Sequence, residues 1–313
     1  MKAVLYNQYG GVEVLKMEEV PKPSFKDQQA LIKIKSVSIN PLDWKVRKGE
    51  MKMMSGSKFP KQTGVDFAGV VENVGASVKN FNIGDEVFGA VNGMKEGALA
   101  DYISIDVKSI WHKPEQISFA EASCLPTAGA AAYKAIEEIA RISADTEILI
   151  NGCTGGVGVM AVQIAKQKGA KVTGVCGSNG VDFAKKLGCD VVFDYSRTAI
   201  SDLPALFDVI FELSGKLKFK DAKTIMKPSS VFINPNPEFI DILKSPFINI
   251  GRSKKNKILL GSPSTINMDY LIKSIESGHR VEVSRVFGFA DYKEAYRFAE
   301  QGGCNGKVVV EVN

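Results

Sequence analysis

The stretch Ile148-Leu149-Ile150-Asn151-Gly152-Cys153-Thr154-Gly155-Gly156-Val157-Gly158 decides how this chain folds. It has the pattern of an apolar strand, a glycine-rich turn and the first turn of a helix, and a second apolar strand begins about 20 residues further on. Glycines here permit a tight turn and close packing of the helix on the strand. The helix N-terminus offers backbone amides and a positive dipole end to phosphate groups. The stretch therefore predicts a dinucleotide-binding turn, with a ligand-free strand–helix turn as the alternative.

The turn and the following strand indicate which cofactor is bound. Aligned to G-x-G-x-x-G, Cys153 takes the first glycine position and Gly155 and Gly158 take the others. The second strand ends before Ser178 and Asn179 without a carboxylate to bind a ribose 2′-hydroxyl, which favours NADP over NAD. Both residues also suit the simpler role of capping the next helix. The expected cofactor contacts of the turn and of this strand end are Cys153, Thr154, Gly155, Gly156, Val157, Gly158, Ser178 and Asn179.

The pattern of strands and helices changes near residue 120. Before it, short β-rich segments separated by glycines predict a mainly-β unit. After it, continuous apolar strands alternate with helices, which predicts a parallel sheet covered on both faces. The last strand, 307–312, is expected to rejoin the first unit. We predict an α/β protein with three segments, residues 1–120, 121–262 and 263–313, in which the middle segment is the dinucleotide-binding domain.

Composition excludes several classes of protein. The 313 residues carry 40 Lys plus Arg and 35 Asp plus Glu, a net charge of +5, and 45% are hydrophobic, as in ordinary globular domains. The densest basic run, 252–257, has no interleaved aromatics, so we expect no nucleic-acid partner. No apolar run suits a signal peptide or a membrane span. Five cysteines without C-x-x-C spacing indicate reduced thiols and a cytoplasmic location.

Several further stretches carry a family resemblance. Three of them are Ser38-Ile39-Asn40-Pro41-Leu42-Asp43-Trp44, Gly64-Val65-Asp66-Phe67-Ala68-Gly69 and Phe81-Asn82-Ile83-Gly84-Asp85-Glu86-Val87. Together with Leu125-Pro126-Thr127, the glycine turn and Gly306-Lys307-Val308-Val309, they resemble the zinc-free quinone oxidoreductase branch of the medium-chain dehydrogenase/reductase superfamily. The resemblance covers essentially the whole chain. It implies a Rossmann-type doubly wound sheet inserted into a mainly-β, GroES-like catalytic domain, with substrate and nicotinamide meeting between the two.

The resemblance also bears on metal binding. Zinc-dependent relatives carry a cysteine in place of Asn40 and Gly-His-Glu in place of Gly64-Val65-Asp66. A catalytic zinc needs about three Cys, His or carboxylate ligands, and two of the expected ones are missing. We interpret the two histidines, His112 and His279, as structural. We therefore predict no metal.

The resemblance assigns roles to individual residues. Asn40 would line the site beside the nicotinamide, Asp43 would shape its loop, and Lys45 would bond the cofactor ribose or a substrate oxygen; these make Asn40 and Lys45 the candidate catalytic residues. Lys45 is equally well explained as a surface lysine, and Trp44 as a core residue. The remaining expected cofactor contacts are Thr127, Tyr195, Leu213, Ser214, Asn234, Gly306 and Lys307.

Without zinc, reduction of a conjugated carbonyl is the simplest chemistry, because a hydride acceptor needs only orientation and a donor to its developing oxyanion. We predict an NADPH-dependent oxidoreductase acting on a small-molecule quinone or an α,β-unsaturated carbonyl, either an enone or an alkenal. The alternatives are a reductase of another activated double bond, such as an acrylate, and a non-enzymatic, crystallin-like or RNA-binding family member. A homodimer formed through the sheet edge near 257–261 is also expected.

Overall fold

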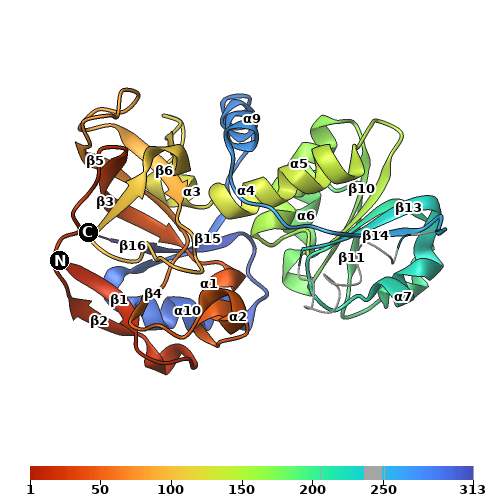
Figure 1. Ribbon diagram of the computed structural model, residues 1–313. Helices are drawn as coiled ribbons and strands as arrows, with labels where there is room; N and C mark the ends of the chain where they lie inside the picture. Colours follow the sequence, from red (N-terminus) through yellow and green to blue (C-terminus); the bar gives the residue numbers. More distant parts are fainter. Residues whose placement is uncertain (205, 236–248, 250, 313) are drawn as a thin grey trace. The chain divides into compact units, whose positions relative to one another are not determined.

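The computed structural model describes residues 1–204, 206–235, 249 and 251–312. The chain forms two compact units, Met1–Thr127 with Pro263–Asn313, and Ala128–Ser262 (Figure 1). The first boundary follows Thr127 and not residue 120, because helix α3, Phe119–Ser123, belongs to the first unit. The Ser38 hydroxyl of that unit donates to the Ser123 carbonyl over 2.8 Å.

Two sheets build the first unit, and their strands pair antiparallel except for β15 and β16, which pair in parallel. The larger sheet has the order β15-β16-β3-β5-β6-β8, with β7 paired to β3, and the smaller has the order β2-β1-β4. The chain's last strand pairs antiparallel with β3, Val309 opposite Ser38, which confirms that it rejoins this unit. The strands are β1 Lys2–Tyr6, β2 Lys16–Glu19, β3 Gln29–Ser38, β4 Lys61–Gln62, β5 Asp66–Val74, β6 Glu86–Ala90, β7 Tyr102–Asp106, β8 Ile110–His112, β15 Val283–Gly288 and β16 Lys307–Glu311.

Helices close this unit against an apolar core. Helix α10 is amphipathic and buries Tyr292, Ala295 and Tyr296 in the main core, where Phe67 and Val310 also lie. Helix α1 begins at Pro41, whose fixed φ suits a first helical position. The helices are α1 Pro41–Arg47, α2 Lys52–Ser55, α3 Phe119–Ser123, α9 Thr265–Glu276 and α10 Tyr292–Gln301, with 3-10 turns η1 Val12–Val14, η2 Val107–Ser109 and η7 Phe289–Asp291.

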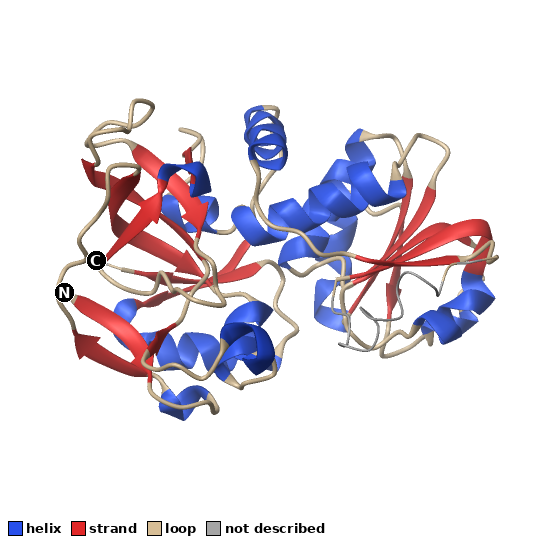
Figure 2. Ribbon diagram, viewed as in Figure 1, coloured by secondary structure: helices blue, strands red, loops and turns tan. Residues whose placement is uncertain are grey.

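The second unit is a parallel sheet of order β11-β10-β9-β12-β13-β14, shown with its helices in Figure 2. In chain order these strands run 3-2-1-4-5-6, the Rossmann arrangement, with the switch point between β9 and β12. The predicted fold class is thus confirmed. The strands are β9 Glu147–Asn151, β10 Lys171–Cys176, β11 Val191–Asp194, β12 Phe207–Glu212, β13 Met226–Asn234 and β14 Lys255–Ile258.

The helices of this unit include one very short one, α7. It stops before Met226, because Met226 pairs with Phe207 in the sheet and Pro228 disfavours helix at the residue before it. Helix α4, Pro126–Tyr133, crosses the boundary between the units. The other helical segments are the π-helix η3 Lys134–Ala140, α5 Gly156–Gln167, η4 Ser178–Gly180, α6 Val181–Leu187, η5 Ile200–Asp202, α7 Phe219–Ala222 and η6 Lys223–Ile225.

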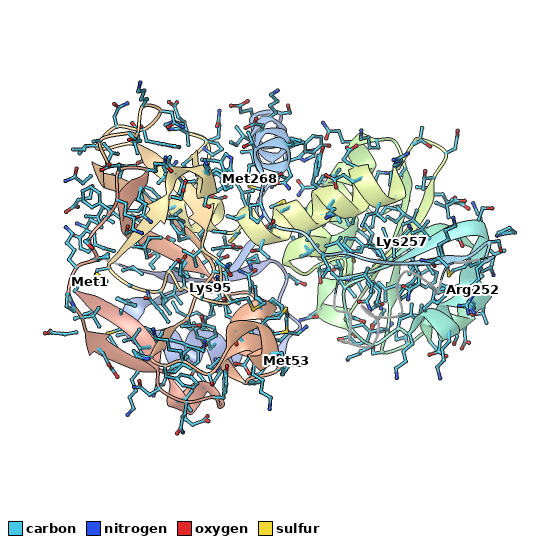
Figure 3. The ribbon with its side chains drawn as sticks, in the orientation of Figure 1. Met1, Met53, Lys95, Arg252, Lys257 and Met268 are labelled. Atoms are coloured by element: carbon cyan, nitrogen blue, oxygen red, sulfur yellow. The ribbon has the colours of Figure 1, made fainter. Side chains whose placement is uncertain are left out.

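The basic run lies along the last strand of this sheet, with Arg252 and Lys257 both exposed (Figure 3). Next to Lys257, the amide and carbonyl of Asn256 are both bonded to the Asn249 side chain, each over 2.7 Å. The Asn249 side chain therefore already binds two backbone groups of β14 that could otherwise pair with a strand of a second copy. The homodimer through this sheet edge stays a prediction.

Candidate functional site

The glycine turn follows β9 and is fixed by backbone contacts. Gly152 has φ +92°, a left-handed conformation that glycine tolerates. The amides of Gly152 and Cys153 both donate to the Val175 carbonyl, over 2.9 and 3.2 Å. A Cβ on Gly158 would lie 2.2 Å from the Gly152 oxygen and 2.7 Å from the Cys153 backbone. Helix α5 thus packs on the turn at a distance that only glycine allows.

The N-terminus of α5 fits the phosphates of a dinucleotide. Its N-cap is Gly155, which has no side chain to cap the first-turn amides of Gly156, Val157 and Gly158. The nearest non-neighbouring atom to a Cβ on Gly155 would be the Gly152 oxygen, at 3.6 Å, so a ligand can approach closely. Cys153 and Thr154 differ from Gly155 and Gly156 because both are buried. The Cys153 sulfur lies inside the unit, 2.7 Å from where a Cβ on Gly174 would be, so only its backbone is available to a cofactor.

The structure brings together the residues predicted to surround the adenosine end. A Cβ on Gly177 would lie 2.9 Å from the Tyr195 hydroxyl and 3.3 Å from Asn179 Oδ1. Sequence reasoning missed Asp194, whose carboxylate accepts the Ser178 hydroxyl over 2.6 Å. Hydrogen bonds from Ser178 and Ser196 lower the pKa of Asp194, so it is ionised at neutral pH. The parallel register, Cys176 opposite Asp194, is the signal that would have placed it here.

A second missed carboxylate lies at the switch point. Glu212 ends β12, is 1% exposed, and accepts from the Asn151 amide over 2.6 Å and from the Ser214 hydroxyl over 2.5 Å. Leu213 lies against the turn, its Cβ 3.2 Å from where a Cβ on Gly152 would be. Asn234 ends the neighbouring strand β13. The predicted residues Leu213, Ser214 and Asn234 do lie at the carboxyl ends of the strands, and Ser214 is bonded to Glu212.

In the first unit, four side chains from distant parts of the sequence form a buried polar network: Asn40, Asp66, Thr127 and Lys307. The Lys307 ammonium donates to the Asn40 side-chain oxygen over 2.5 Å and to the Ile39 carbonyl over 2.7 Å. The Asn40 amide donates to Asp66 over 3.0 Å. Asp66 in turn accepts the Thr127 amide and hydroxyl over 3.0 and 2.7 Å.

Local sequence places each member of the buried polar network. Asn40 is the N-cap of α1 and Asp66 is the first residue of β5. Thr127 is the second residue of α4, and Lys307 opens β16. Before it, Gly306 has φ +96°, and a Cβ there would lie 2.3 Å from the Glu282 carbonyl oxygen, so glycine is required for this turn.

The network engages the whole polar end of the Asn40 side chain. That side chain is 2% exposed, its side-chain amide donates to Asp66 and to the Ser38 carbonyl, and its oxygen accepts from Lys307. The Lys307 ammonium likewise donates to groups of the first unit, the Asn40 side-chain oxygen and the Ile39 carbonyl. The catalytic role of Asn40 and the cofactor contact of Lys307 stay predictions.

The electrostatics of the network are those of buried charge. Burial raises the pKa of Asp66, and the nearby Lys307 ammonium and the Thr127 bonds act in the opposite direction. Burial raises the pKa of the neighbouring Asp43 to about 7, although one of its oxygens accepts the Asn40 backbone amide over 2.8 Å. Taking a carboxylate out of water disfavours its charged form, which explains both directions.

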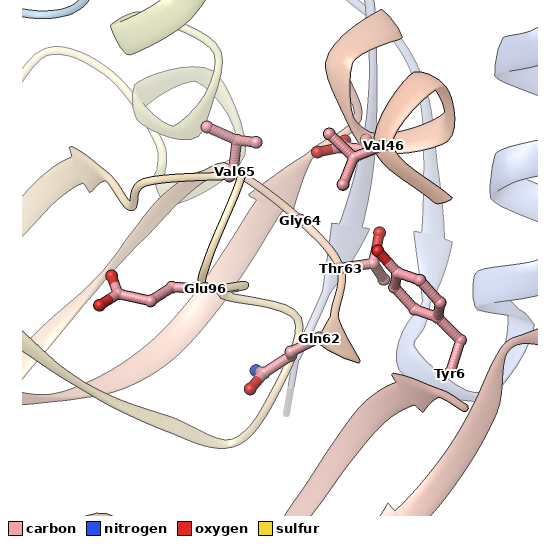
Figure 4. Close-up of a pocket in the computed structure, with 9 residues that line it drawn as sticks. Tyr6, Val46, Gln62, Thr63, Gly64, Val65 and Glu96 are labelled. Carbon is pink, nitrogen blue, oxygen red and sulfur yellow. The ribbon is translucent and has the colours of Figure 1, made fainter. Parts of the chain in front are cut away.

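A small cavity adjoins Asp43. It has a volume of about 10 Å³, about that of one water molecule, and Tyr6, Gln62 and Thr63 lie along it (Figure 4). Among the described residues, Asp43 Oδ1 and Gln62 Nε2 are buried atoms without a hydrogen-bond partner. The cavity lies beside the network and is too small for a substrate.

The remaining predicted residues of α1 have distinct surroundings. Trp44 packs against the main core of the first unit, as expected. Lys45 is half-buried in the last turn of the same helix. Of the two predicted catalytic residues, Asn40 and Lys45, Lys45 is therefore the one whose side chain reaches the surface.

The positions that hold a metal in zinc-dependent relatives hold other groups here. Asn40 and Val65 replace the cysteine and histidine, and the Lys307 ammonium lies 2.5 Å from Asn40 Oδ1. Within the described part of the chain, no three His, Cys, Asp or Glu side chains are grouped to hold a metal ion. His112 stacks on Phe81, with ring centroids 4.6 Å apart. No helix in the described ranges is long and apolar enough to cross a membrane.

Comparison with known proteins defines the class. Residues 26–115 match the alcohol dehydrogenase GroES-like domain and residues 156–233 match the zinc-binding dehydrogenase family. The chloroplast envelope quinone oxidoreductase homolog of Arabidopsis thaliana is 31% identical over 99% of this chain and 98% of its own length. An NADPH-dependent alkenal/one oxidoreductase of the same plant is 32% identical over 99% of this chain and 79% of its own length.

A solved structure agrees with these matches. The quinone oxidoreductase from Coxiella burnetii has a TM-score of 0.91 and 30% identity, covering 100% of this chain and 99% of its own. The fold and site are those of a medium-chain dehydrogenase/reductase. Within that superfamily, the chain belongs to the quinone oxidoreductase branch.

Proposed function

We propose that this protein is a zinc-independent, NADPH-dependent reductase of quinones or α,β-unsaturated carbonyls. The observation that carries the proposal is the Lys307 ammonium on Asn40, a cation in the network where zinc-dependent relatives place a metal ligand. A second positive charge at that place would be repelled. Relatives named quinone oxidoreductase, alkenal/one oxidoreductase and 2-methylene-furan-3-one reductase support the substrate class.

The chain's own residues supply binding and orientation. When bound, the reduced nicotinamide supplies a hydride to the quinone or to the β-carbon of the enone. The first-turn amides of α5 would hold its phosphates. Asp66 fixes the backbone and hydroxyl of Thr127, and Lys307 fixes Asn40, so this part of the site is held before substrate arrives. Lys45 is the proposed donor to the oxygen on which negative charge develops.

The preference for NADPH rests on the residues at the end of β10. The Tyr195 hydroxyl and Asn179 lie together there, and the Lys216 ammonium lies 5.6 Å from the Tyr195 ring centre. These groups suit a 2′-phosphate, and relatives named as NADPH-dependent support it. Asp194 disfavours NADPH, because its carboxylate, which accepts the Ser178 hydroxyl there, repels a phosphate.

All five cysteines are free thiols, which supports a reducing compartment such as the cytoplasm. Relatives named chloroplastic and mitochondrial widen the choice of compartment.

The test is steady-state kinetics on the purified protein. NADPH or NADH is supplied with an ortho-quinone, a para-quinone, a short enone and an alkenal, and loss of the reduced nicotinamide absorbance is followed. We expect turnover with NADPH that a chelator leaves unchanged. Lys45→Ala should lower kcat more than it raises KM if Lys45 stabilises the oxyanion. The matched control is Lys48→Ala, three residues further along the chain, whose side chain pairs with Glu300 over 2.7 Å.

Three results would contradict the proposal. Chelator-sensitive alcohol oxidation would contradict zinc independence. Equal kinetics for the Lys45→Ala enzyme would remove Lys45 from the site. Tight NADPH binding without turnover of any acceptor would favour a non-enzymatic member of the family.

A further inference from the structure

Three cysteines lie together beneath the nucleotide-binding turn. Cys153 belongs to the turn itself, Cys176 ends β10, and Cys189 follows α6. All three are buried, and the Cys153 sulfur interacts with both of the others. None of them has a part in the proposed hydride transfer.

Gly174 shows how closely the sulfurs approach. A Cβ on Gly174 would lie 2.7 Å from the Cys153 sulfur and 2.8 Å from the Cys189 sulfur, so both sulfurs fill the space above this glycine. Cys176 is two residues further along the same strand, so its side chain is on the same face of the sheet. The three sulfurs thus gather on one face of β10.

The backbone geometry of Cys153 and Cys176 suits a crosslink. The Cys153 amide donates to the carbonyl of Val175, the residue before Cys176, over 3.2 Å. Cys153, two residues beyond the end of β9, therefore lies beside the end of the neighbouring strand β10, and neighbouring strands are separated by about 4.8 Å. Disulfides form across Cα–Cα distances of about 4.4–6.8 Å.

The pair also has the chemistry to react. The interaction between the two sulfurs lowers the pKa of Cys176 and raises that of Cys153. The thiolate is the reactive form of cysteine, so Cys176 is the sulfur that attacks an oxidant first.

We infer that Cys153 and Cys176 form a redox-sensitive pair whose disulfide distorts the glycine turn and weakens nucleotide binding. In the first step the Cys176 sulfur takes one oxygen from a peroxide, giving a sulfenic acid and one water or alcohol. The Cys153 sulfur then displaces that oxygen as a second water, and the S–S bond forms. Two thiols are oxidised by two electrons and the peroxide is reduced by two, so the step is balanced.

The turn cannot absorb the new bond without moving. Bonded sulfurs lie about 2.05 Å apart, closer than sulfurs that are not bonded, so Cys153 must shift. The Cys153 backbone packs directly against the start of α5, since a Cβ on Gly158 would lie only 2.7 Å from it. A shift of Cys153 therefore changes the relation between the turn and the helix amides that hold phosphate. This consequence rests on the proposed nucleotide binding.

The experiment treats the reduced full-length protein with hydrogen peroxide, then maps disulfides by mass spectrometry and measures NADPH affinity by fluorescence. We expect a Cys153–Cys176 bond, at least about tenfold weaker NADPH binding, and recovery with dithiothreitol. By reciprocity, saturating NADPH should shift the disulfide equilibrium toward the thiols by the same factor in a thiol–disulfide buffer. Cys176→Ser should abolish both the bond and the loss of affinity.

The matched control is Cys304→Ser, which removes the half-exposed cysteine of the other unit. This variant should still lose NADPH affinity on oxidation. A bond between Cys153 and Cys189 would overturn the choice of partner. Resistance of all three thiols to peroxide, or a Cys153–Cys176 bond with unchanged NADPH affinity, would overturn the inference. If the reduced protein bound no NADPH, the proposed function would fail and the regulatory step with it, while the mass would still report whether the bond forms.

Discussion

The glycine turn of the second unit and the buried polar network of the first are built in opposite ways. The turn is one continuous stretch, 151–158, whose backbone is the functional part and whose side chains are mostly absent or buried. The network joins residues 40, 66, 127 and 307 through their side chains. A backbone site can be recognised from neighbouring residues, whereas a side-chain network exists only once the chain has folded.

The two regions also differ in what holds them. The turn depends on close packing, since a Cβ on Gly158 would overlap the Gly152 oxygen. The network depends on a buried ammonium and a buried carboxylate, each compensated by hydrogen bonds. A closely packed turn is destabilised by added side-chain volume, whereas a buried charge network is destabilised by the loss of one of its partners.

The largest effect is expected from Lys307→Met, which keeps the volume and removes the charge. Asn40 and the Ile39 carbonyl would lose their donor and Asp66 its nearest compensating cation. Removing one partner of a buried charged pair lowers the free energy of unfolding by about 3–5 kcal/mol. Displacement of Thr127 should also reduce turnover by about tenfold to a hundredfold. Urea unfolding and steady-state kinetics measure the two effects.

Lys48→Met is the matched control, because its ion pair with Glu300 is at the surface, with 39% of the lysine side chain exposed. Such pairs contribute less than about 1 kcal/mol. Equal unfolding free energies for the Lys307→Met and Lys48→Met proteins would show that the network does not stabilise the first unit.

The glycine turn is tested by two alanine substitutions. Gly158→Ala forces a Cβ to within 2.2 Å of the Gly152 oxygen and should cost about 1–3 kcal/mol in stability. Gly155→Ala meets only an ordinary contact at 3.6 Å, and its φ of −76° suits alanine. It should leave stability within about 0.5 kcal/mol yet weaken NADPH binding about tenfold, or about 1.4 kcal/mol.

The two readouts separate packing from ligand contact. Melting temperatures report the first, and NADPH titrations report the second. If Gly155→Ala bound NADPH as tightly as the native protein, the phosphates would not lie in front of Gly155, and the fit of the turn to a dinucleotide would be wrong.

These contrasts explain what sequence could predict. The turn and the strand alternation around it follow from local patterns, and the structure confirms the Rossmann order. The bonds of the Asn40 side chain to Asp66 and Lys307 could not be predicted, because sequence gives no distance between these residues. Asp194 was missed because its approach to Ser178 depends on the register between β10 and β11.

The second domain boundary, between residues 262 and 263, lies where it was expected, whereas the first lies a few residues after residue 120 for a related reason. The first unit extends to Thr127 because α3 packs on its strands and Thr127 bonds Asp66. A change in the pattern of strands and helices marks a new domain only approximately, since a helix shows in its sequence that it is amphipathic but not which sheet it covers.

The pH dependence of stability distinguishes the network from the turn, which has no titrating carboxylate of its own. Burial raises the pKa of Asp43 from 3.8 to about 7 in the folded protein. Between these values the folded state binds more protons than the unfolded state, so stability falls as pH rises. The slope from this group reaches about 1.4 kcal/mol per pH unit.

Asp43→Asn keeps an oxygen for the Asn40 amide and removes the titration. Urea unfolding at pH 5 and pH 8 should therefore show a smaller loss of stability in this variant than in the native protein. Parallel pH profiles for the two proteins would mean that Asp43 is not protonated in the folded state.

The smallest effect is expected at the adenosine end of the nucleotide site, where the Asp194 side chain is still 10% exposed to solvent. Asp194→Asn removes the carboxylate that accepts the Ser178 hydroxyl, while its amide oxygen can still accept that bond. Charges in contact with solvent interact by about 0.2–1 kcal/mol, so the ratio of kcat/KM for NADPH to that for NADH should rise about two- to fivefold.

Salt makes this last prediction specific. The change in cofactor preference should shrink in high salt, because exposed charges are screened within about 10 Å at 0.1 M ionic strength. Asp202→Asn, an exposed aspartate of the same unit that accepts from Ser201 over 3.0 Å, should leave the preference unchanged. An unaltered ratio in the Asp194→Asn enzyme would mean that the 2′-position of the cofactor lies away from β11. The Tyr195 and Lys216 pair beside Asp194 would then have no phosphate to bind, and the preference for NADPH would need another source.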